Sequence, residues 1–212
     1  MESHTLGTFE IFVLLFITLG PLKMLAPWMQ RTRDLDPAAE RKVAIWAFII
    51  ATVAAVAGSA LGRILAGNWH VSIGALSVTA GIIFFLVALK QLLQGYDPPH
   101  APVAPPPLPP SPVAAAAMLL FPVVLTPYGI AAVIVLLASN REPERIAMIY
   151  ALLVLVMILN LLAMLYARRM MVGLTIIVLQ VLGAILGVLQ VGLSIEFTVY
   201  GLRSLGVLSG AR

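Results

Sequence analysis

Long apolar runs follow one another along the chain, separated by short polar loops, and they constrain the fold more than any other feature. Several reach the roughly 20 residues that an α-helix needs to cross about 30 Å of hydrocarbon. Hydrophobic residues make up 61% of the chain and charged residues only 10%. The predicted fold class is therefore an all-α polytopic membrane protein, in contact with the lipid bilayer. We expect six transmembrane spans, at about Leu6–Trp28, Val43–Leu65, Val71–Leu93, Ala114–Ala138, Ile146–Tyr166 and within Val172–Val207.

Composition excludes several classes of protein. The chain has no cysteine, which removes disulfides, thiolate catalysis and cysteine-based metal sites. It has no Gly-rich phosphate loop, no His-x-x-x-His pair and no Gly-x-Ser-x-Gly turn, so we expect no enzyme activity, no cofactor and no metal. A net charge of +4 fits basic loops near lipid head groups better than nucleic-acid binding. The N-terminal stretch lacks a basic region before its apolar run, which predicts a retained first span.

A proline-dense linker, "GYDPPHAPVAPPPLPPSP", interrupts the apolar pattern near the middle of the chain. Such a stretch favours extended polyproline II conformations over helix. We interpret it as a spacer, with docking of a proline-recognition domain as the alternative. It divides the chain into a first three-span repeat at 1–94, the linker at 95–112 and a second three-span repeat at 113–212.

Each half opens with a span that is broken before a proline, at Gly20-Pro21 and at Thr126-Pro127. Paired interruptions at corresponding positions are typical of repeat transporters with a site at the membrane midplane. Three spans in each half would place the halves in opposite orientation, so we expect a 3+3 inverted repeat whose first and fourth spans are broken at Pro. The alternative is a pair of simple proline kinks filled by neighbouring helices.

The two breaks predict one substrate-binding site. A helix that stops inside the membrane leaves N–H groups at one end and C=O groups at the other, which suit a carboxylate and an ammonium respectively. Hydroxyls of Thr126 and Tyr128 would add contacts, so a zwitterion fits. Lys23 would bind an anion, or extend to the head groups instead. The candidate substrate-binding residues are Gly20, Pro21, Lys23, Thr126, Pro127, Tyr128 and Gly129.

Glu196, in "QVGLSIEFTVYGL", is the only carboxylate well inside an apolar stretch. An ionisable group there is a functional candidate by default, and we expect it to be the coupling carboxylate of a proton-dependent transporter. A structural pair with Arg203, or a head-group contact, is the alternative. The final apolar stretch is longer than one crossing requires. It predicts either one long helix or a short interfacial helix followed by a span.

Small residues form stripes that would let helices approach closely in lipid. Basic residues divide seven to five between the two sides, which by the positive-inside rule places both termini outside the cytoplasm. The seven are Arg31, Arg33, Arg41, Lys42, Lys90, Arg168 and Arg169.

At the breaks and in the third span, the chain resembles the MarC family of six-span bacterial membrane proteins. "GPLK" stands where that family usually has Asn-Pro-x-Gly, and "FPVVLTPYGIA" is similar to its Pro-Leu…Gly-Pro-Gly-Ala-Ile pattern. "HVSIGALSVTAGIIFFLVALKQLL" looks like its Gly-Ile-Ser…Arg-Ile-Ala-Gly-Gly-Ile-Leu-Leu-Phe segment. The chain departs from the family at the polar positions: Gly20 replaces Asn, Lys23 replaces Gly, Ser77 replaces Arg, and Glu196 stands where Gln is common.

The resemblance implies a bacterial inner-membrane protein related to small exporters and neutral amino-acid transporters. We therefore expect a secondary transporter or exporter of a small polar solute, with neutral amino acids favoured, that works by alternating access. The alternative is a non-transporting membrane subunit that packs against a larger membrane complex, or a homo-oligomer. A third hypothesis is lipid handling, with Lys23 and Arg63 as head-group contacts.

Overall fold

A computed structural model describes residues 7–21, 24–94, 107–120, 124–140, 142–173 and 176–208. All regular secondary structure in these residues is helical, as the apolar runs predict. The helices in this part of the chain are α1 (Thr8–Leu19), α2 (Leu25–Thr32), α3 (Pro37–Asn68), α4 (Ile73–Gln94), α5 (Pro112–Leu119), α6 (Pro127–Ala138), α7 (Pro143–Gly173) and α8 (Ile176–Ser204). Most of the proline-rich linker lies outside the described residues.

The long helix α3 begins six residues before the apolar run that predicts it. Asp36 is its N-cap, and the Asp36 carboxylate accepts a hydrogen bond from the Ala39 N–H at 2.5 Å. Pro37 occupies the first helical position, where a proline has no intrahelical bond to lose. Glu40, Arg41 and Lys42 therefore lie in the first turns of a helix and not in a loop. Polar caps of this kind extend helices beyond their apolar cores.

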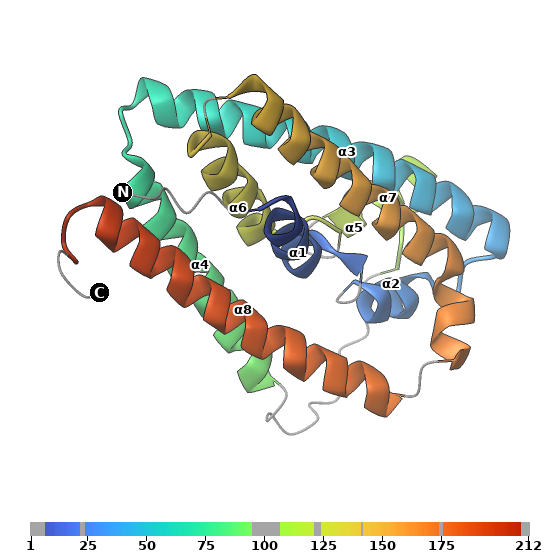
Figure 1. Ribbon diagram of the computed structural model, residues 1–212. Coiled ribbons are helices and arrows are strands. Elements are labelled where there is room, and N and C mark those ends of the chain that lie inside the picture. The colour runs from blue at the N-terminus through green and yellow to red at the C-terminus, as the bar shows by residue number, and fades with distance from the viewer. Residues whose placement is uncertain are drawn as a thin grey trace.

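The final apolar stretch forms α8, one continuous helix, which decides between the two alternatives for this region. It packs along α4 in an antiparallel pair (Figure 1). A Cβ at Gly74 would meet Gly201 O at 3.0 Å, while one at Gly81 would meet Ser194 O at 2.7 Å. Because larger side chains would clash there, the small residues of both helices allow this close approach.

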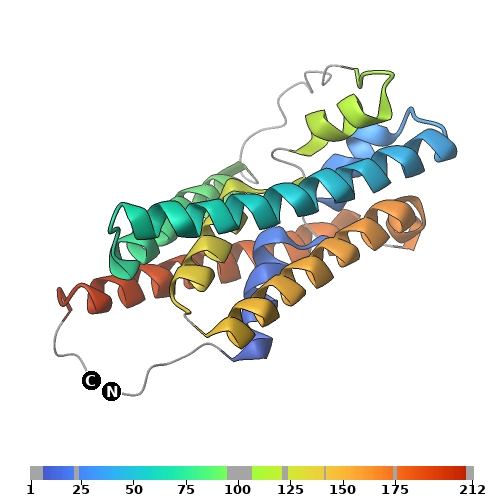
Figure 2. The same cartoon turned by 90° about the horizontal axis from the view of Figure 1, so that it is seen from above.

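The other two long helices, α3 and α7, form a second pair, and the short helices α1 and α6 lie between the pairs (Figures 1 and 2). The helix α1 contacts α7 and α8, while α6 contacts α3 and α4. Small residues on α3 face this interior: Ala47, Ala51, Ala55 and Ser59 are all buried. The middle of the molecule is thus built around the two short helices.

Both predicted breaks fall where one α-helix ends and the next begins. In the first half α1 ends at Leu19 and α2 begins at Leu25, and in the second half α5 ends at Leu119 and α6 begins at Pro127. Among the described residues, three helices are long and apolar enough to cross a membrane: Pro37–Asn68, Ile73–Lys90 and Pro143–Arg169. These helices support a membrane protein. The count of six spans and the inverted repeat remain predictions.

Candidate functional site

The first break leaves backbone carbonyls at the end of α1 without partners inside the helix. Gly20 is the C-cap, with φ −76° and ψ 171°, so the chain leaves the helix in an extended conformation. Pro21 has no N–H and cannot bond to Ile17 O, four residues back. A Cβ at Gly20 would clash with the Phe16 carbonyl. The residues Gly20 and Pro21 therefore end the helix in the buried interior of the molecule.

Three polar side chains from three different elements donate hydrogen bonds to the last carbonyls of α1. Gln190 Nε2, on α8, donates to Ile17 O at 3.2 Å. Thr126 Oγ1, at the start of α6, donates to Thr18 O at 2.9 Å. Asn160 Nδ2, on α7, donates to Leu19 O at 2.7 Å.

These three donors are buried; Gln190 is 2% exposed, Thr126 7% and Asn160 1%. Asn160 lies near the middle of α7, and Gln190 lies near the middle of α8. The end of α1 is thus held at the centre of the bundle, at mid-depth of the long helices. Side chains supply the partners that water would supply at a surface, as backbone inside hydrocarbon requires.

The other end of the Asn160 amide, its oxygen, has no hydrogen-bond partner within the described ranges. Its Nδ2 faces the Leu19 carbonyl, which needs a donor, and this bond fixes which amide atom is nitrogen. The Oδ1 atom is then a buried acceptor that makes no hydrogen bond among the described residues. Leaving a buried acceptor unpaired costs about 1–3 kcal/mol, so such a group needs an explanation. The Asn160 side chain that carries this oxygen lies beside the broken end of α1.

The second break brings the start of α6 against the end of α1. Thr126 is the N-cap of α6, but its hydroxyl donates to Thr18 O and does not cap its own helix. A Cβ at Gly129 would clash with the Leu19 side chain, so glycine permits the contact between the two helix ends. Tyr128 is buried and stacks on Phe84 of α4, with ring centroids 5.2 Å apart.

The structure therefore brings Gly20 and Pro21 close to Thr126 and Gly129, and it places the other candidates differently. Pro127 is the exposed first residue of α6. Lys23 lies outside the described residues. Glu196 is exposed on α8, and among the described residues no ion pair reaches it, from Arg203 or from any other group. At 100° per residue it is turned about 120° away from Gln190, so it lies outside the polar cluster, which is formed by Thr126, Asn160 and Gln190.

Two residues of the cluster are absent from the candidates that the sequence predicts. Asn160 stands alone in "VLVMILNLLAML", and Gln190 falls within a stripe of small residues that indicates packing. Uncharged polar side chains in such runs usually bond to other helices, and this isolation in apolar sequence is the signal that marks both. Within the described part of the chain, no group of His, Asp or Glu side chains is arranged to hold a metal ion.

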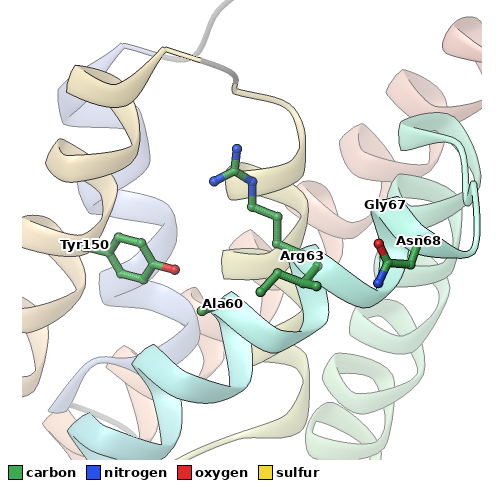
Figure 3. Close-up of a pocket in the computed structure, with 6 residues that line it drawn as sticks. Ala60, Arg63, Gly67, Asn68 and Tyr150 are labelled. Atoms are coloured by element: carbon green, nitrogen blue, oxygen red, sulfur yellow. The ribbon is translucent and has the colours of Figure 1, made fainter.

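Arg63 lines a pocket of about 390 Å³ between α3 and α7. Figure 3 shows the Tyr150 hydroxyl turned toward Ala60 and Arg63, with Asn68 further along α3. The pocket is far along α3 from Asp36, near the helix end. It offers one guanidinium, one amide and one phenol, which fits an interfacial position better than a transport site.

Comparison with protein families identifies the chain. The family model described as MarC family integral membrane protein matches residues 7–205, and this range includes both breaks and every residue of the polar cluster. Comparisons with curated proteins and with solved structures gave no match. Because the match covers nearly the whole chain, the protein belongs to the MarC family of integral membrane proteins.

Proposed function

We propose that the protein is a secondary transporter or exporter of a small polar solute, with neutral amino acids as the first candidates, and that the two helix breaks form its binding site. The observation that carries this proposal is the Oδ1 of Asn160 at the end of α1, which has no hydrogen-bond partner among the described residues. A buried acceptor with nothing to accept from is suited to a solute that brings its own donor. An ammonium group supplies three donors.

The surroundings of Asn160 favour a cationic donor over a neutral one. The carbonyls of Ile17, Thr18 and Leu19 lie at the negative end of the α1 dipole. Each carbonyl oxygen has two lone pairs, and the side-chain donors use one. An ammonium group beside Asn160 would therefore interact with the amide oxygen and with the dipole of α1 together.

The start of α6 provides the complementary end for a carboxylate. The first N–H groups of any helix have no carbonyl partner within it, and the dipole there is positive. Thr126 makes no side-chain cap bond at this end, and its hydroxyl donates to Thr18 O of α1. With Gly129 against Leu19, the positive end of α6 and the negative end of α1 are adjacent. Two opposite dipole ends at this spacing suit a zwitterion such as a neutral amino acid.

Burial of the cluster corresponds to a closed state of an alternating-access cycle. Asn160 is 1% exposed, so a solute reaches it only after helices separate. The three hydrogen bonds on α1 come from α6, α7 and α8, and each is a contact that can break as a helix moves. A solute whose ammonium group replaces such a donor would favour the open form by its differential binding.

Glu196 is the proposed coupling carboxylate, acting through its helix and not by contact with the solute. It shares α8 with Gln190, which holds the end of α1. Gain or loss of a proton at Glu196 would change how α8 sits in the bilayer, because a charged carboxylate is costly in hydrocarbon. That movement would reach α1 through the Gln190 bond.

The proposed topology is six spans as a 3+3 inverted repeat in a bacterial inner membrane, with both termini outside the cytoplasm. Support comes from the order of elements, since a broken helix precedes two long helices in each half. The basic Arg41 and Arg168 share one end of the bundle. The start of α1 is at the other end, where Thr8 Oγ1 donates to Met148 Sδ at 3.1 Å.

Counterflow in proteoliposomes tests the proposed function. Vesicles preloaded with unlabelled alanine, serine or leucine should accumulate the labelled amino acid faster than protein-free vesicles. The N-acetyl and amide derivatives, which each remove one charge of the zwitterion, should not exchange. Absence of counterflow with every neutral amino acid, at both inside and outside pH values between 5 and 8, would reject this substrate class.

A second candidate function is a non-transporting subunit of a larger membrane complex, and the position of Glu196 favours it. This residue lies between the levels at which α8 meets Gly74 and Gly81, inside the span Ile73–Lys90. It is exposed beside Ile195, which is also exposed. A partner would remove an exposed carboxylate from lipid. Fixed-stoichiometry co-purification with another membrane protein, together with absent counterflow, would support this function.

A further inference from the structure

The end of the bundle opposite the start of α1 holds an ion pair that orients one arginine. Arg168 Nε, near the end of α7, contacts Glu40 Oε2 on α3 at 2.7 Å. Arg168 Nη2 also donates to Leu35 O at 2.7 Å. Glu40 is 7% exposed, and its second oxygen accepts from Thr32 Oγ1 at 3.3 Å. The guanidinium is held by two acceptors and keeps its other N–H groups available.

A pocket of about 390 Å³ lies beside this ion pair, and two further arginines line it. Arg41 and Arg169 make no ion pair among the described residues. Arg168 neutralises Glu40, so the pocket retains two uncompensated guanidinium charges. Guanidinium groups bind phosphate oxygens through paired N–H donors, which makes this a phosphate-binding arrangement.

Apolar residues of α7 line part of the pocket, and their place in the sequence indicates the boundary between hydrocarbon and head groups. Met164, Leu165 and Tyr166 line it, and they lie in the last apolar turn of the α7 span before Arg168. On the facing helix, Arg41 comes just before the apolar run that begins at Val43. Tyrosine and arginine at the ends of spans mark the membrane interface. A phosphate bound here would have room for acyl chains along Leu165.

We propose that the pocket between α3 and α7, formed by Arg41, Arg168 and Arg169, binds the phosphate of an anionic phospholipid. The two excess charges favour a head group without an ammonium of its own, such as phosphatidylglycerol, over zwitterionic phosphatidylcholine. Basic pockets between spans are typical sites for acidic head groups. The lipid would bridge α3 and α7 at the end where Glu40 and Arg168 already join them.

The test uses the full-length chain in detergent micelles and follows its thermal unfolding with added lipid. The informative variant is Arg41→Gln with Arg169→Gln, which removes both uncompensated charges and leaves the Glu40–Arg168 pair intact. Arg63→Gln is the matched control, because Arg63 lines a pocket of the same volume that offers a single guanidinium. Added ligands are phosphatidylglycerol, phosphatidylcholine and inorganic phosphate.

We expect phosphatidylglycerol to raise the melting temperature of the wild type and of Arg63→Gln more than phosphatidylcholine does. The double variant should bind phosphatidylglycerol about 30-fold more weakly, because each interfacial arginine contributes about fivefold. Equal shifts with the two lipids, or an undiminished shift in the double variant, would overturn the proposal. An equal shift with inorganic phosphate would assign the pocket to free anions and overturn the lipid assignment.

Discussion

The Nδ2 of Asn160 donates to the carbonyl oxygen of Leu19 at 2.7 Å, which joins the middle of α7 to the broken end of α1. The bond connects the two halves of the chain, and the amide oxygen of Asn160 is buried with no hydrogen-bond partner in the part of the chain that the structure describes. One side chain therefore donates a hydrogen bond to the end of a helix and keeps a buried acceptor for the proposed solute. The predictions below separate these two roles.

Replacing Asn160 by alanine should destabilise the protein. The Leu19 carbonyl would lose its buried donor at a cost of about 1–3 kcal/mol in unfolding free energy, and removal of the unpaired Oδ1 offsets only part of that cost. Asn140→Ala is the matched control, because Asn140 Nδ2 also donates to a carbonyl, Leu136 O, at 2.7 Å, but at a part-buried helix end. Thermal unfolding in detergent should show the larger loss for Asn160→Ala. Equal losses would mean that the break at α1 has no special need for a donor.

The Gln190 hydrogen bond should stabilise the protein because Pro21 has no N–H that could donate to Ile17 O. In Pro21→Ala the residue regains an N–H, which can extend α1 and bond to Ile17 O. Gln190→Ala should then cost about 1 kcal/mol less in the Pro21→Ala background than in the wild type. A double-mutant cycle on unfolding free energies measures this coupling. Additive effects would contradict the account of the Gln190 bond.

Gly129→Ala should destabilise the protein by about 1–3 kcal/mol, because its Cβ would overlap the Leu19 side chain and separate the two helix ends. Gly192→Ala is the control: it is also helical, but nothing lies within 4 Å of the added Cβ. This control should be neutral or more stable by up to about 1 kcal/mol, since alanine is a better helix former than glycine. Thermal unfolding of the two variants side by side checks the difference in sign.

Glu196→Gln should leave stability within about 0.5 kcal/mol of the wild type, because the side chain is exposed and unpaired among the described residues. Counterflow by this variant should lose its dependence on pH, since glutamine cannot exchange a proton. The measurement compares initial rates at pH 5.5 and 7.5 in wild-type and variant proteoliposomes. An unchanged pH dependence would remove Glu196 from the coupling role.

The sequence predicts the helical class, the membrane setting and the position of both breaks, because length, hydropathy and proline act locally. Gly20-Pro21 and Thr126-Pro127 can be located without knowing any contact. The side chains that donate to the broken end of α1 cannot be assigned in the same way, since they come from helices far away in the sequence. Asn160 and Gln190 carry a weak local signal, an uncharged polar residue in an apolar run. Only packing decides which carbonyl each one reaches.

Helix boundaries show the same division between local and long-range information. The α3 helix begins at Pro37 because Asp36 caps it, and capping extends the helix into charged sequence that hydropathy assigns to a loop. Glu40 consequently lies on a helix, with Arg168 of α7 as its partner. That ion pair joins residues 128 apart, so no local pattern predicts it.

Counterflow of a labelled neutral amino acid in proteoliposomes, compared between the wild type, Asn160→Ala and Asn140→Ala, tests whether Asn160 binds the solute. If Asn160 Oδ1 accepts from the ammonium group of the solute, its removal should weaken apparent binding roughly 10- to 100-fold, the value of a hydrogen bond to a charged group. Asn140→Ala should exchange like the wild type. Saturable counterflow with the same half-saturating concentration in all three proteins would contradict a substrate site at the broken end of α1.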